Sequence, residues 1–159
     1  MTFQLSPQLD GDFNSAFALY RKYVENFKYK FPSSVLNLIA NPDWYGGVES
    51  KAPHDGLVSL FTLTKVDSES SQIELVVTKP WLDLTIRIRY VDVCDFNISV
   101  SGRPGAPMEW RYEQFRYFDG FQAYGIKDKK LFTHDIELVD GTVWNITAAD
   151  IDVRWEIAE

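Results

Sequence analysis

The sequence has few of the residues that commonly carry catalysis or crosslinks. Cys94 is its only cysteine, so no disulfide can form within the chain. No apolar run approaches the roughly 20 residues that a membrane-spanning helix needs. The first residues, Met1 to Asp12, lack the basic and apolar regions of a secretion signal. These absences predict a cytoplasmic protein that does not bind a membrane and needs no disulfide.

Positive charge is also scarce. The 159 residues include 16 Lys or Arg and 23 Asp or Glu, which gives a net charge of −7. Nucleic-acid binding rests on Lys and Arg side chains that contact phosphates, so this balance argues against it. A basic macromolecular partner suits the charge better.

Most of the net charge lies in the last quarter of the chain. Residues 134–159 contain seven carboxylates and one base, so they carry −6 of the total −7. Apolar and acidic residues alternate there, as in strands with one buried face, and Asp140-Gly141 is a strong hairpin signal. The pattern predicts an acidic partner-binding face on these strands. Its members are Asp135, Glu137, Asp150, Asp152 and Glu156.

One amphipathic helix precedes the strands. Between residues 12 and 31, apolar side chains recur at steps of three or four, the period of a helix with one buried stripe. Pro32 should end this helix, and a short second helix is expected from Val35 to Ala40. We expect the stripe to pack against a sheet. Its members are Phe13, Phe17, Tyr20, Val24, Phe27 and Phe31.

From Leu57 onward the apolar residues alternate with period two, most regularly from Leu82 to Tyr90. Met108–Phe118 fits a strand, although its pattern also allows a helix. The chain then has roughly eight strands without helices between them, which excludes parallel βαβ units. We expect a single domain over residues 1–159, with a helical part at about 12–40 and a β part at about 55–158. The expected fold class is α+β and mainly antiparallel: a roughly eight-stranded sheet, a sandwich or a half-barrel, with the N-terminal helix packed against it.

The two histidines, His54 and His134, each precede an aspartate, which invites a metal-binding or acid–base interpretation. Their separation has no ligand signature, and His134 and Asp135 must point to opposite faces of a strand. His134 falls on the apolar register, so we expect a core residue held by a hydrogen bond. The sequence has no nucleophile elbow and no phosphate-binding loop. It therefore predicts no catalytic residue, no metal site and no cofactor.

Three features of the chain have counterparts in a known class of proteins. They are the Pro53–Leu57 turn that leads into strands, the alternating strands around Leu82–Tyr90, and the acidic C-terminal strands that carry Trp144 and Trp155. In these respects the chain resembles the small acidic immunity proteins of bacterial toxin–immunity systems, including contact-dependent growth inhibition. The resemblance implies a non-catalytic inhibitor that binds a cognate toxin, often a nuclease, one to one in the cytoplasm. It assigns no individual binding residue.

Two functional interpretations follow from the sequence. In the first, the acidic face neutralises a basic partner, and exposed aromatic residues anchor the complex. The candidate anchors are Trp44, Tyr45, Tyr124 and Trp144. In the second, a curved sheet encloses an aromatic-lined pocket for a small molecule, and His54 or His134 acts as the base of an enzyme. Polar groups that converge inside a pocket would favour the second, whereas carboxylates clustered on a firm outer surface would favour the first.

Overall fold

The computed structural model describes residues 13–45, 50–100, 107–120 and 128–158. Its N-terminal part contains helix α1 (Phe13–Phe27), a 3₁₀ turn η1 (Lys28–Lys30) and helix α2 (Ser33–Ala40). The first helix is shorter than the sequence pattern predicts. Phe31 has an extended backbone, with φ −84° and ψ 147°, because the ring of Pro32 disfavours the helical conformation in the preceding residue. Both predicted helices are otherwise confirmed.

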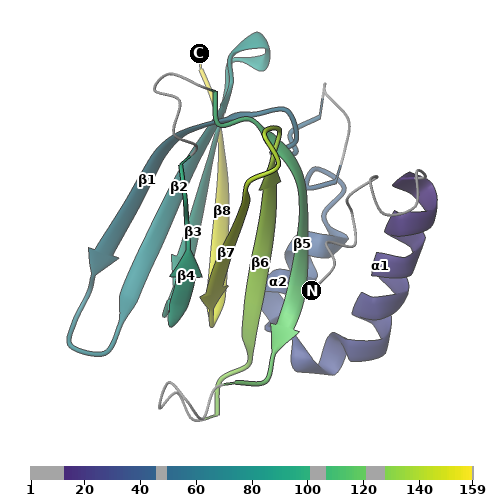
Figure 1. The fold of residues 1–159 in the computed structure, drawn as a ribbon, viewed down its shortest axis with the longest axis vertical. Coiled ribbons are helices and arrows are strands. Elements are labelled where there is room, and N and C mark those ends of the chain that lie inside the picture. The colour runs from purple at the N-terminus through teal and green to yellow at the C-terminus, as the bar shows by residue number, and fades with distance from the viewer. Residues whose placement is uncertain (1–12, 46–49, 101–106, 121–127, 159) are drawn as a thin grey trace.

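Eight strands form two antiparallel sheets of four strands each (Figure 1). Their bounds are β1 (Leu57–Lys65), β2 (Ser71–Lys79), β3 (Leu84–Val91), β4 (Asp95–Asn97), β5 (Trp110–Phe118), β6 (Leu131–Leu138), β7 (Val143–Ala148) and β8 (Asp150–Ile157), with a 3₁₀ turn η2 (Pro80–Leu82) before β3. The first sheet has the order β1-β2-β3-β8, and the second has the order β4-β7-β6-β5. The α+β, mainly antiparallel class is confirmed. The strands form neither one eight-stranded sheet nor a closed barrel.

A bent two-stranded ribbon joins the sheets. β3 pairs with β8 in the first sheet, and their chain neighbours β4 and β7 pair in the second. At the bend Asp92 adopts a left-handed backbone with φ 52°, which an aspartate tolerates better than most residues. Its carboxylate accepts hydrogen bonds from Ser70 Oγ and Lys129 Nζ, so neighbouring turns hold the bend in place.

The main core lies between the two sheets. On β3 every second side chain is buried, and Ile86 and Ile88 of this strand are among the fully buried residues. The regular alternation that the sequence predicts for this strand is confirmed. β6 differs, because all eight of its residues are buried, including the polar ones. Its apolar face, with Phe132 and Ile136, completes the core.

Helix α1 packs along the outer edge of β5. The hydroxyl of Tyr20 accepts a hydrogen bond from the backbone N–H of Phe115 at 2.8 Å, and that of Tyr23 accepts one from Tyr117 at 3.2 Å. The ring of Tyr23 also stacks on Tyr117. Edge strands carry unpaired backbone groups that invite association with other chains. The aromatic side of α1 thus satisfies and covers this edge.

Replacing Tyr20 with Phe should destabilise the protein by about 1–3 kcal/mol, because the buried N–H of Phe115 loses its acceptor. Tyr29, whose side chain is exposed on the turn after α1, provides the control through Tyr29→Phe. Urea unfolding measures both free energies. Equal values for the two variants would show that the hydroxyl of Tyr20 does not stabilise the edge.

Candidate functional site

Asp135, the first predicted member of the acidic face, lies on β6 and is only 3% exposed. Its carboxylate accepts hydrogen bonds from Asn145 at 2.6 Å and from Gln114 at 2.9 Å. The Nε and Nη2 atoms of Arg116 bind the same carboxylate as a fork. These side chains come from the three neighbouring strands β5, β6 and β7, so Asp135 is the centre of a closed polar network. It is not part of an exposed acidic surface.

Glu137 follows Asp135 on the same face of β6 and is also buried, with Arg111 3.5 Å from its carboxylate. The other three predicted residues lie on β8, in the first sheet. Asp152 faces both Arg89 and Arg154 at 3.2 Å, so its charge is locally compensated. The expectation that all five residues share one exposed acidic face is therefore wrong, since they belong to two sheets and two of them are buried.

On β8, Glu156 is exposed but faces Arg87 at 3.0 Å, and the same arginine lies 3.4 Å from Glu74 on β2. The outer face of the first sheet is thus a ladder of alternating charges across β2, β3 and β8. Asp150, at the start of β8, is exposed and accepts a hydrogen bond from the next backbone N–H, that of Ile151. Of the five predicted residues, it is the one whose carboxylate forms no ion pair with a described residue.

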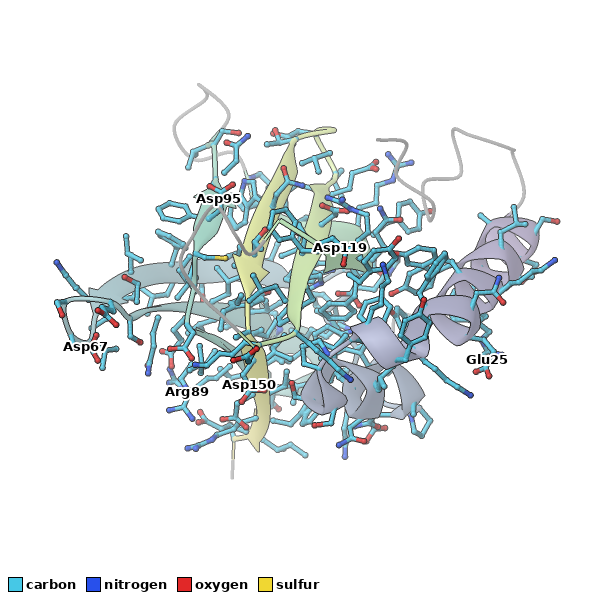
Figure 2. The ribbon with its side chains drawn as sticks, turned by 90° about the horizontal axis from the view of Figure 1, so that it is seen from below. Glu25, Asp67, Arg89, Asp95, Asp119 and Asp150 are labelled. Atoms are coloured by element: carbon cyan, nitrogen blue, oxygen red, sulfur yellow. The ribbon has the colours of Figure 1, made fainter. Side chains whose placement is uncertain are left out.

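A different group of carboxylates gathers at one end of the sandwich, the end viewed in Figure 2. Hydrogen bonds join three segments there: Ser70 Oγ donates to Asp92, Val93 N–H donates to Ser71 O, and Ala149 N–H donates to Val91 O. We call the carboxylates of these turns and their neighbours the acidic end. It consists of Asp67, Glu69, Asp92, Asp95, Asp128 and Asp150, with Lys65, Arg89, Lys129 and Lys130 beside them.

The predicted aromatic anchors are mostly inside the protein. Trp44 and Trp144 are each 1% exposed, and the indole N–H of Trp144 donates to Ser99 O at 2.7 Å. Tyr45 is partly buried, and its hydroxyl lies 3.4 Å from that of Tyr20. Tyr124 lies outside the described residues. Neither tryptophan can serve as a surface anchor, because both belong to the core.

A chain of three polar side chains crosses the core. His134 Nδ1 lies 2.7 Å from the hydroxyl of Tyr90 on β3, and His134 Nε2 bonds to the Glu113 carboxyl on β5. The rings of Trp44, Trp110 and Phe115 surround the histidine, with the Phe115 ring stacked on it at 4.1 Å between centroids. The prediction that His134 is a hydrogen-bonded core residue is confirmed.

Burial determines which of these three side chains carry a proton. Desolvation raises the pKa of Glu113 well above its usual value, an effect that the nearby Trp44 indole partly opposes. It also lowers the pKa of His134 well below its usual value. The pKa of Tyr90 is raised by desolvation and by the Glu113 carboxyl. Both shifts favour the neutral forms of the pair, in which Glu113 keeps its proton and His134 gains none. Because His134 is 0% exposed, this proton cannot be passed to a substrate at the surface.

His54 lies at a more open corner, before β1. Its Nδ1 is 2.8 Å from Asp55 Oδ2, and its ring contacts that of Tyr112. The buried Lys79 Nζ lies nearby and donates to Ser50 O at 2.9 Å. Desolvation lowers the pKa of Lys79, an effect that the charge of Asp55 opposes. Gly56 is required here, because a Cβ would lie 2.4 Å from a Val77 methyl group. The close approach explains the glycine in the Pro53–Leu57 turn.

Comparison of the chain with protein-family models, curated proteins and solved structures gave no significant match. Among the described residues, none of the helices is long and apolar enough to cross a membrane. Function is therefore inferred from the residues of this chain and their geometry.

Proposed function

We propose that this chain is a non-catalytic binding protein that neutralises a basic protein partner through its acidic end. By its resemblance to small acidic immunity proteins, the partner is a cognate bacterial toxin, often a nuclease, and the complex is one to one in the cytoplasm. The observation that carries the proposal is the gathering of carboxylates, five of the six exposed, from sequence-distant turns at one end of the two packed sheets. The negative electrostatic potential of these carboxylates speeds association with a basic protein and disfavours binding of acidic proteins.

The position of His134 argues against its use as a catalytic base. A general base must reach the proton that it removes, either directly or through one water molecule. His134 bonds through both ring nitrogens to core residues and is enclosed by aromatic rings. It therefore suits a structural role.

The proposal predicts that Glu69→Lys combined with Asp150→Lys weakens partner binding at least about tenfold at low salt, because it reverses two exposed charges of the acidic end. Both side chains are exposed, so the fold should survive. The tagged variant and the tagged wild type would serve as bait in a host lysate. Quantitative mass spectrometry of the captured basic protein measures the loss.

The matched control is Glu25→Lys combined with Asp43→Lys, which changes the net charge equally at a distance from the acidic end. Glu25 lies on α1, on the opposite side of the molecule from Asp67 in Figure 2. Normal capture by the control and poor capture by the first variant would support the acidic end as the binding surface. Equal capture by both folded variants would overturn it.

A further inference from the structure

β1 is the outermost strand of the first sheet, and no described strand lies beyond it (Figure 1). Within the part of the chain that the structure describes, the outer side of β1 is bonded at its beginning alone, where the N–H of Val58 donates to Met108 O and Leu57 bridges to Glu109. From Ser59 to Lys65 no described residue bonds to the outer backbone groups of β1, and we call this stretch the open edge. This contrasts with the edge of β5, which the tyrosines of α1 satisfy. The protein therefore covers one edge strand and leaves another available.

The hairpin between β1 and β2 shows which backbone N–H and C=O groups of β1 point away from β2. Val66 N–H donates to Ser70 O across the β1–β2 hairpin, so the groups of Val66 point toward β2. Along an antiparallel strand, the backbone groups of successive residues point alternately toward one side of the strand and toward the other. The N–H and C=O groups of Phe61, Leu63 and Lys65 therefore point to the open edge. A bulge between Val58 and Leu60 shifts the alternation, which agrees with the outward N–H of Val58.

Apolar side chains accompany these open backbone groups. Phe61 and Leu63 lie on the core side of β1, opposite Leu75 and Ile73, yet Leu63 is 47% exposed. Across the gap between the sheets, Phe96 of the short strand β4 contacts Phe61 and is 42% exposed. β4 is the end strand of the second sheet, and no described strand follows it on this side. The sandwich thus opens at this flank onto a small apolar surface.

Carboxylates border the open flank. Asp67 and Glu69 lie in the turn after β1, and Asp95 begins β4, whereas Lys65 supplies the one basic group on β1. Figure 2 shows Asp67 and Asp95 on this side of the molecule. An added strand would meet hydrogen-bonding groups along the edge, apolar contacts on one face and negative charge at its rim. These properties suit an extended segment that alternates apolar and basic residues.

We propose that an extended strand of the basic partner pairs with β1 at residues 59–65 and adds a fifth strand to the first sheet. The inference rests on the proposed function and extends it by naming the docking edge. Main-chain hydrogen bonds to Phe61, Leu63 and Lys65 bind the added strand, and the acidic rim selects its charge.

A synthetic seven-residue peptide of alternating Val and Lys tests the edge directly. Hydrogen exchange measured by NMR should show that this peptide slows exchange at the amides of Phe61, Leu63 and Lys65, while the amides that already bond to β2 change little. A peptide of alternating Val and Glu should protect these three amides far less. Absence of protection by saturating Val–Lys peptide would overturn the inference.

Two variants at one position separate backbone pairing from apolar contact. Leu63→Pro removes an outward N–H, a change that an edge strand tolerates, and should weaken peptide binding on the order of tenfold. Leu63→Thr keeps the N–H and should retain most of the binding. Circular dichroism verifies the fold of each variant. Equal binding by both folded variants would contradict strand pairing.

The outcomes separate this inference from the proposed function. If the Val–Lys peptide leaves the three amides unprotected while the wild-type protein still captures a basic protein, strand pairing at β1 is refuted and the proposed function is retained. If the peptide pairs with β1 but no basic protein is captured, the proposed function is refuted, whereas β1 is supported as an edge that accepts a strand. Protection of the same amides in the isolated protein as its concentration rises would identify a second copy as the occupant and overturn the partner strand.

Discussion

The free energy of unfolding should contain a contribution from Glu113 and His134 that is highest between about pH 4.5 and pH 6.5, their ordinary pKa values. Burial raises the pKa of Glu113, so above pH 4.5 the unfolded chain loses a proton that the folded chain keeps, and stability falls as pH rises. Burial lowers the pKa of His134, so below pH 6.5 the unfolded chain gains a proton that the folded chain lacks, and stability falls as pH drops. Between the two values these slopes cancel.

Outside this window each slope is about 1.4 kcal/mol per pH unit until the folded group itself titrates. Glu113→Gln should remove the alkaline slope. The stability of the variant relative to wild type should therefore rise by about 1.4 kcal/mol for each pH unit above about 4.5, until the folded wild type itself releases the Glu113 proton, although the substitution itself costs stability at pH 5. Below pH 6.5 the variant should keep the slope that His134 causes.

Urea unfolding from pH 4 to pH 9 measures these curves. Glu69→Gln is the control, because Glu69 is exposed at the acidic end and its loss should leave the shape of the curve unchanged. Parallel curves for Glu113→Gln and wild type above pH 6.5 would show that the buried pair does not retain its proton.

Asp135→Ala should destabilise the protein by about 3–5 kcal/mol. The substitution leaves the largely buried guanidinium of Arg116 without its carboxylate, and it removes an acceptor from Gln114 and Asn145. Asp152→Ala is the matched control. It deletes the same kind of side chain from an exposed ladder, where ion pairs contribute about 0–1 kcal/mol.

Chemical denaturation of both variants at neutral pH distinguishes the two environments. A similar small loss for both would mean that Asp135 is no more important than a surface carboxylate. That result would also reopen Asp135 as a partner-binding residue, because the network around it would then be dispensable.

Local patterns in the sequence predicted several elements correctly. The alternation from Leu82 to Tyr90 indicates a strand with one buried face, and β3 has this form from Leu84, after Leu82 ends the 3₁₀ turn. Asp140-Gly141 indicates a hairpin, and Gly141 has the positive φ of 85° that such a turn needs between β6 and β7. Pro32 marks the end of the first helical segment. In each case the deciding interaction lies within a few residues.

The candidate acidic face failed because alternation shows which side chains share a face, but it does not show what covers that face. Asp135 and its neighbours form a polar layer that long side chains from β5 and β7 bury. Nor does alternation reveal that β8 belongs to the other sheet. The acidic end, in turn, is formed by turns that are distant in sequence, so no local pattern indicates it.

Glu113 was missed for a different reason. A bulge between Trp110 and Tyr112 shifts the register of β5 by one residue. Glu113 therefore lies beside Ile136 and points toward the core with Phe115. Counted from the buried Trp110, a strict period of two puts Glu113 on the opposite face, so the local pattern gave no signal that this glutamate is buried. The partner of His134 could be found only from the paired strands.

The most direct measurement of the central claim is the capture of a partner by the tagged wild-type protein from its native host lysate at low and moderate salt, with the products of neighbouring genes included. We predict one basic protein in equimolar amount, bound at low salt and released as salt screens the acidic end. Recovery of no basic protein at any salt concentration, or of a complex indifferent to salt, would contradict an electrostatic neutraliser.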